Sequence, residues 1–228
     1  MSHNSDISCG AIAGAVDSDA VITFCSTQGE IKTDMTLQGK PYNNSGGIIG
    51  NNRGTISYCR ADVKVTASSD ANDTSRECNA GGIAGINTGT ILACEASGSE
   101  VSAKASNAKA QAGGIAGTTS GSSYIASCAS EVGKIIANSG GHEAYAGGVV
   151  GLQAGVLYSS YARGDATAEG ASTINMAGAI VGDNSSNDTD LCIGTGAGAG
   201  TGGQGTSDLP PSSDSIPVSY THLTLPTT

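Results

Sequence analysis

The sequence predicts an all-β fold, namely a β-solenoid or β-helix-like stack of about five to six glycine-rich repeats of 31–36 residues. A five-residue phrase, Gly-Gly-hydrophobic-x-Gly, recurs along the chain with this period. No helical hydrophobic pattern lies between its copies, which is typical of stacked β units. The chain also has 35 glycines among 228 residues, no Trp and one Phe, which is too little aromatic volume for one large core.

The glycine phrase sets the period of the repeat. Its clear copies end at Gly50, Gly85, Gly117 and Gly151, and weaker copies end at Gly14 and Gly182. These six repeat glycines advance by 36, 35, 32, 34 and 31 residues. Four residues after each clear copy comes another glycine, where we expect a tight turn with positive φ; these are Gly54, Gly89, Gly121 and Gly155.

The second half of each repeat carries a hydrophobic residue followed, three positions later, by a small one. The pairs are Ile22 and Cys25, Ile56 and Cys59, Ile91 and Cys94, Ile125 and Cys128, and Leu157 and Ser160. In a straight strand, positions i and i+3 face opposite sides. We therefore predict a bend between the two residues, so that both line a shared narrow interior. A third apolar position is expected at Ile31, Val63, Val101, Val132 and Ala166.

Four of the seven cysteines occupy this ladder, at intervals of 34, 35 and 34 residues. No two cysteines have C-x-x-C spacing and no histidine accompanies them, which argues against a zinc site. Because serine replaces cysteine at Ser160, we expect a column of small buried thiols. A disulfide between neighbouring coils is compatible with the usual Cα separation and stays open. The states of Cys9 and Cys78, off the ladder, also stay open.

The domain organisation follows from composition. Residues 7–193 form the repeats, and the polar, alanine-rich tracts at 67–79 and 103–111 are expected to be loops between them. Residues 194–217 are rich in Gly, Ser, Thr and Pro and are expected to be a flexible linker. Residues 218–228 resemble a translated sequencing adapter and are excluded from the fold. Because the first repeat begins almost at Met1, we expect the chain to be a fragment.

The chemistry-bearing residues do not assemble into a recognisable site. The formal net charge of −10 and the lack of a basic cluster argue against nucleic acid as a partner, and no apolar run is long enough for membrane insertion. His142 and Glu143 lack the second histidine of a zincin helix. The acids Asp62, Glu95, Glu131 and Asp165 lie at unequal offsets from the ladder. We therefore expect no catalytic residue, no metal ligand and no cofactor.

The pattern G-G-[IV]-x-G-x-x-x-G-x-I-x-x-C-x-[AS], complete at residues 46–61 and 81–96, resembles the GLUG-motif repeat. The resemblance implies a bacterial exported protein located outside the cell or on its surface, although no export signal is visible in this chain. It implies a non-catalytic repeat region that acts as an adhesin-like stalk or binding scaffold. The expected partner is a host or cell-surface protein or glycan, contacted by the loops between repeats.

Two other functions stay open. The chain fits an accessory repeat region of a secreted enzyme, such as an IgA-specific metallopeptidase, whose catalytic domain lies outside it. It also fits, less well, a polysaccharide-active β-helix, which would need acids at one repeat position on successive coils.

Overall fold

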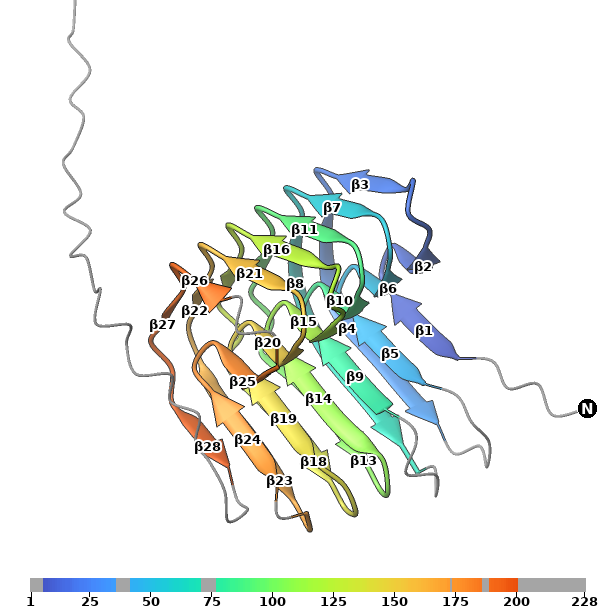
Figure 1. Ribbon diagram of the computed structural model, residues 1–228. Coiled ribbons are helices and arrows are strands. Elements are labelled where there is room, and N and C mark those ends of the chain that lie inside the picture. The colour runs from blue at the N-terminus through green and yellow to red at the C-terminus, as the bar shows by residue number, and fades with distance from the viewer. Residues whose placement is uncertain (1–5, 36–41, 71–76, 173, 186–188, 201–228) are drawn as a thin grey trace, which may run out of the picture.

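The computed structural model describes residues 6–35, 42–70, 77–172, 174–185 and 189–200. These residues form a parallel β-solenoid of about five turns, and no helix occurs among them (Figure 1). The predicted fold class is confirmed. No segment of the described chain forms a helix with the length and apolarity that a membrane span requires.

Each coil contributes strands to four parallel sheets, which we call A, B, C and D in chain order. Sheet A consists of β1 (Ile7–Gly10), β5 (Asn43–Gly46), β9 (Glu77–Gly81), β14 (Lys109–Gly113), β19 (Ala144–Gly147) and β24 (Asn175–Gly178). Sheet B consists of β2 (Ala13–Val16), β6 (Ile49–Asn52), β10 (Ala84–Asn87), β15 (Ala116–Thr119), β20 (Val150–Gln153) and β25 (Val181–Asn184). The glycine phrase forms the turn from sheet A to sheet B.

Sheets C and D complete each coil. Sheet C consists of β3 (Val21–Thr23), β7 (Thr55–Ser57), β11 (Thr90–Leu92), β16 (Tyr124–Ala126), β21 (Val156–Tyr158) and β26 (Thr189–Asp190). Sheet D begins with the long strands β4 (Ser26–Met35) and β8 (Arg60–Ser69). In later coils the same path is divided into β12 (Glu95–Ala96) and β13 (Glu100–Ala105), β17 (Ala129–Ser130) and β18 (Lys134–Ser139), β22 (Tyr161–Ala162) and β23 (Asp165–Gly170), and β27 (Ile193–Gly194) and β28 (Gly198–Gly200).

The bend predicted between the paired ladder residues exists and has a definite backbone cause. At the corner between sheets C and D, one non-glycine residue per coil has φ between 46° and 54°: Phe24, Tyr58, Ala93, Ser127, Ser159 and Leu191. Such a residue reverses the alternation of side chains, so the positions two before and one after it both face inward. The corner thus accounts for the spacing of three.

The hydrophobic half of the ladder stacks in register. Ile22, Ile56, Ile91, Ile125 and Leu157 pair directly from coil to coil, and all but Ile22 are completely buried. The third apolar column differs from the prediction at two positions. Ile31 pairs with Val65 and Val101 pairs with Ile135, so Val63 and Val132 lie outside that column although both are buried. Side chains of a strand alternate between its two faces, so Val63 and Val65 both face the core. The pairing of neighbouring strands decides that Val65 belongs to the column.

The second glycine of each repeat has a different role from the one predicted. Among the described glycines only Gly29 and Gly164 have positive φ, so Gly54, Gly89, Gly121 and Gly155 do not. A Cβ atom on Gly89 would lie 2.5 Å from the Arg53 carbonyl oxygen. The repeat glycines are required for the same reason: a Cβ on Gly85 would lie 2.6 Å from the Ser45 nitrogen. Close stacking of backbones, and not conformational freedom, selects glycine at these positions. Gly121 is the exception, because the atom nearest to a Cβ there would be 3.6 Å away.

The ordered coils extend beyond the predicted boundaries. Strand β28 pairs with β23 and carries the solenoid to Gly200, seven residues into the expected linker 194–217; residues 201–217 and the tail 218–228 lie outside the described residues. The expected loop tracts are also shorter. Ala67 to Ser69 belong to β8 and Ala103 to Ala105 belong to β13, and both segments are paired. A polar, alanine-rich sequence is compatible with a strand when one face packs on the core.

Buried amide side chains hold the turns between sheets B and C. The Nδ2 group of Asn87 donates to the Gly89 carbonyl oxygen at 3.2 Å, and that of Asn52 donates to Asn87 Oδ1 at 2.8 Å. Both residues are completely buried. These asparagines satisfy carbonyl groups of the turn inside the stack, where water is excluded.

Candidate binding surface

The predicted ladder cysteines lie in the core and are free thiols. Cys59, Cys94 and Cys128 are 1–2% exposed, as is Ser160, whereas Cys25 in the first coil is half-buried. Each interior thiol lies 3.3 Å from the carbonyl oxygen two residues before it, and Ser160 Oγ makes the same bond at 3.1 Å. The small residue therefore caps the corner by hydrogen bonding, which explains why serine can replace cysteine.

Burial sets the protonation state of these thiols. Desolvation raises the pKa of Cys94 to about 12 and that of Cys128 to about 11, and it also raises the pKa of Cys59. A thiol with so high a pKa stays protonated near neutral pH and is a poor nucleophile and metal ligand. The column is structural.

The remaining cysteines also lie on inward-facing columns or at the end of the ladder. Cys9 pairs with Ser45, and Cys78 pairs with Asn43 and Ala110, all in sheet A. Cys78 is completely buried, which raises its pKa to about 12. Cys192 follows Thr189, the partner of Leu157, and is the sixth ladder position, which the sequence analysis missed. Its spacing of 32 residues from Ser160 is the signal that identifies it.

The acids of the described coils are spread over the surface, and several lie beside basic side chains of neighbouring coils. Glu95 lies in register with Arg60 and forms an ion pair with it at 3.2 Å. Asp165 lies in register with Lys134, which in turn pairs with Glu100. Alternating charges on successive coils keep like charges apart in a parallel stack. No group of three or more His, Cys, Asp or Glu side chains in the described coils is placed to hold a metal ion.

A second charged column runs along the start of the sheet A strands. Glu77 lies in register with Lys109, whose ammonium is 3.7 Å from Glu143. Burial raises the pKa of Glu77. Burial has the same tendency at Glu143, but hydrogen bonds from His142 and the backbone, together with Lys109, lower its pKa overall. Since Lys109 stands between the two carboxylates, this column is an ion ladder and lacks the open pair that a glycosidase requires.

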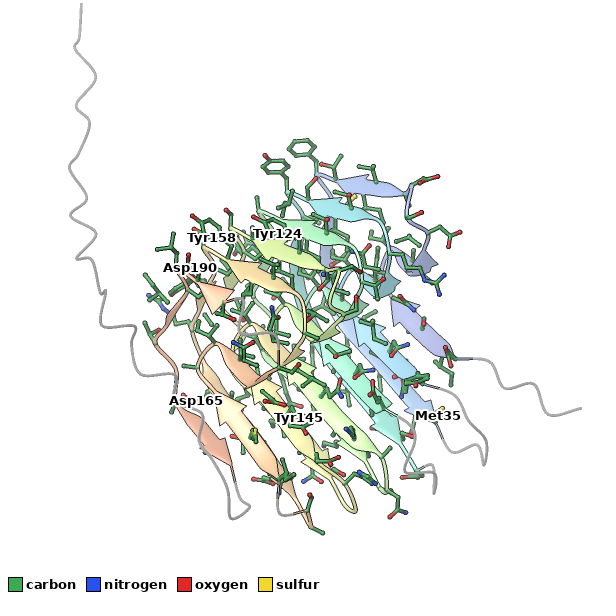
Figure 2. All side chains as sticks on the ribbon, viewed as in Figure 1. Met35, Tyr124, Tyr145, Tyr158, Asp165 and Asp190 are labelled. Carbon is green, nitrogen blue, oxygen red and sulfur yellow. The ribbon has the colours of Figure 1, made fainter. Side chains whose placement is uncertain are left out.

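Most of the scarce aromatic residues lie along sheet C and the adjoining start of sheet D. Five of the eight aromatic residues in the sequence belong to this aromatic edge: Phe24, Tyr58, Tyr124, Tyr158 and Tyr161. Phe24 and Tyr58 are 78% and 60% exposed and stack with ring centroids 5.2 Å apart. Tyr124 and Tyr158 come from neighbouring coils and project outward near one another (Figure 2). Tyr145 is buried at 7% exposure, whereas the four most exposed aromatic side chains of the described residues all belong to the aromatic edge.

Polar groups surround these rings. The guanidinium of Arg163 lies 5.8 Å from the centroid of the Tyr161 ring, and Asp190 lies in register with Tyr158. The Arg60 and Glu95 ion pair belongs to the same side of sheet D as Tyr161. Exposed rings with nearby hydrogen-bonding groups are suited to hold sugar rings or protein side chains. The sequence analysis had favoured loops as contact sites and did not identify this edge; residues 36–41 and 71–76 lie outside the described residues.

Comparison with known proteins adds a similarity of fold. No protein-family model matches the chain, and no curated protein matches it. A solved structure described as a "putative immunoglobulin A1 protease" from Bacteroides ovatus is similar, with a TM-score of 0.49 and 21% sequence identity. The alignment covers 87% of this chain and 66% of that one, so the chain spans slightly less than two thirds of the length of that structure. At this identity the similarity concerns the fold and not the activity.

Proposed function

We propose that the chain is a non-catalytic binding scaffold, the repeat region of a bacterial surface or secreted protein, and that its aromatic edge contacts a glycan or protein of another surface. The observation that carries this proposal is the exposure of Phe24, Tyr58, Tyr124 and Tyr158 along sheet C and its corner with sheet D, outside a core built from Ile, Val, Ala and Cys. Exposing large rings in water is unfavourable unless a partner covers them.

The remaining chemistry supports a role without catalysis. The thiols of Cys94 and Cys128 are buried and stay protonated near neutral pH, and the carboxylates Glu95 and Glu143 are each engaged with a basic side chain. The bacterial and extracellular setting rests on the resemblance of residues 46–61 and 81–96 to the GLUG-motif repeat.

The test compares two matched double variants of the folded chain. Tyr124→Ser with Tyr158→Ser removes two rings of the aromatic edge, while Lys64→Ser with Lys134→Ser changes the outer side of sheet D. Both are measured against an array of mucin-type and cell-wall glycans and against host epithelial cells. We expect at least a tenfold loss of binding for the tyrosine variant alone, since truncating a tyrosine that anchors an interface costs about 2 kcal/mol or more. Equal binding by both variants would contradict the proposal.

The resemblance to the GLUG-motif repeat also supports a second function, in which the chain is an accessory repeat region of a secreted enzyme. In that case the aromatic edge would hold the substrate of a neighbouring catalytic domain. A metal-binding or other catalytic motif encoded next to this repeat region, together with binding of that enzyme's substrate by this chain, would favour this alternative.

A further inference from the structure

A recess with a volume of about 420 Å³ lies where the strands of sheet D end. Its walls come from four successive coils, at the ends of β4, β8, β13 and β18 and just beyond them. Met35, the last residue of β4, marks this end of the sheet in Figure 2, away from Tyr124 and Tyr158. Strands β8, β13 and β18 have neighbours on both sides. The recess is therefore a feature of the stacked coils and is separate from the aromatic edge.

Parallel register arranges the lining side chains in two rows along the stack. The first row, paired directly from coil to coil, consists of Asp34, Ser68, Lys104 and Asn138. The second row follows two residues later in the chain and includes Asp70 and Ser106. Neighbouring strands of a sheet lie about 4.8 Å apart, so four of them span about 14 Å. The recess is thus a groove whose shape suits an elongated ligand.

The side chains of the groove are polar and accessible. Asp34, Asp70, Lys104 and Ser106 are exposed, and Asn138 is half-buried. Ser106 Oγ donates to Asp70 Oδ1 at 3.0 Å, which holds that carboxylate beside the groove. In the described coils no ion pair involves Asp34 or Lys104. Both charged groups can therefore hydrogen-bond a ligand without breaking an ion pair within the protein.

The charges of the groove select against acidic ligands. Its lining contains two carboxylates and a single ammonium group, and the whole chain has a formal net charge of −10. A polyanion such as a nucleic acid or a sulfated glycan would be repelled. Ala105 is the one apolar side chain of the lining, so an apolar ligand would gain little from burial there. A neutral chain rich in hydroxyl groups meets both conditions, since each hydroxyl can donate and accept.

We propose that this groove is a second binding site, which holds a short stretch of a neutral oligosaccharide along the stack of coils. Hydroxyl groups of the sugar donate to the carboxylates of Asp34 and Asp70 and accept from the Lys104 ammonium and the Asn138 amide. The site uses no residue of the aromatic edge. The two proposals therefore stand or fall separately.

The test follows binding to the full chain by NMR. Cellotriose, maltotriose and chitotriose are titrated into nitrogen-15-labelled protein, with trigalacturonate as an acidic comparison and CaCl₂ alone as a cation comparison. Lys104→Ala removes a donor from the groove. Lys134→Ala is the matched control, because Lys134 is an exposed lysine at the start of β18, outside the groove. The Tyr124→Ser with Tyr158→Ser variant reports separately on the aromatic edge.

The expected result is saturable shifts of the Ser68, Lys104 and Asn138 amide signals with at least one neutral trisaccharide. Lys104→Ala weakens this binding at least tenfold, whereas Lys134→Ala and the tyrosine variant bind as the wild-type chain does. The inference is overturned if no neutral trisaccharide shifts these signals, if trigalacturonate binds more tightly, or if only CaCl₂ perturbs the groove. Shifts confined to the aromatic edge and lost in the tyrosine variant would also overturn it, while leaving the proposed function intact.

Discussion

Ile91 and Cys94 are three residues apart and yet lie in the same core, with 0% and 1% exposure, because Ala93 between them has a φ of 48°. The thiol of Cys94 then reaches the Leu92 carbonyl oxygen at 3.3 Å. The same relationship recurs in every coil. One left-handed residue therefore converts a two-residue strand period into the three-residue spacing seen in the sequence.

The left-handed corner predicts a strong dependence on the residue type placed there. In Ser127→Val, a β-branched side chain is forced into φ near 54°, and we expect a loss of about 1–2 kcal/mol of unfolding free energy. Ser127→Asn should be tolerated, since asparagine adopts this conformation readily. The matched control Ser57→Val, in strand β7, should stay within about 0.5 kcal/mol. Urea unfolding measures all three, and equal stability of the two Ser127 variants would contradict the role of the corner.

Two glycines that each follow a repeat glycine by four residues should respond oppositely to the same substitution, because the coil of Gly121 places Ser123, and not Gly121, next to Gly89 in the stack. A Cβ on Gly89 would lie 2.6 Å from the Arg53 carbonyl carbon, whereas the nearest atom to a Cβ on Gly121 is 3.6 Å away. We expect Gly89→Ala to lose about 1–3 kcal/mol through overpacking. Gly121→Ala should be neutral or gain about 0.4–1 kcal/mol by restricting the unfolded chain. Thermal and urea unfolding distinguish these outcomes; a similar loss for both would mean that the turn, and not stacking, requires glycine.

Thiol accessibility should follow position along the stack. Cys78, Cys94 and Cys128 are buried, whereas Cys9, Cys25 and Cys192 in the end coils are partly exposed. Brief iodoacetamide treatment of the folded chain followed by peptide mass spectrometry should modify the second group first. In denaturant all seven cysteines should react at similar rates. Equal labelling of the buried and end cysteines before unfolding would refute the inward thiol column.

The buried thiols also predict a loss of stability at alkaline pH. Burial raises the pKa of Cys94 to about 12, above the ordinary thiol value of about 8.5. A raised folded-state pKa gives a contribution that is complete below the unfolded-state pKa and disappears as pH rises toward the folded-state value. Between about pH 9 and 11, each such thiol should lower the unfolding free energy by about 1.4 kcal/mol per pH unit.

Two variants isolate this effect. Cys94→Ser should flatten the dependence of unfolding free energy on pH, because serine does not titrate in this range and already occupies the equivalent site at Ser160. Ser160→Cys should make it steeper by adding a thiol to the same column. An unchanged slope in both variants would assign the alkaline loss to other groups.

Much of the fold was predictable because repetition makes the core visible. The recurrence of Ile22, Ile56, Ile91, Ile125 and Leu157 indicated a stacked column, and their direct register confirms it. The prediction of the third apolar column was wrong at Val63 and Val132. The two-residue period of a strand does not tell how many residues separate the corner from the next core position. The aromatic edge was not predictable because its members occupy different repeat positions, such as the first residue of β16 and the last of β21.

The sequence by itself determined the solenoid, its period and the identity of the ladder, because in a parallel stack each residue is packed mainly against the same residue of the next coil. Only the tertiary structure decided the left-handed corner, the true reason for the glycines and the gathering of the aromatic side chains. These depend on backbone dihedral angles and on distances between sheets, which the spacing of residues along a chain does not contain.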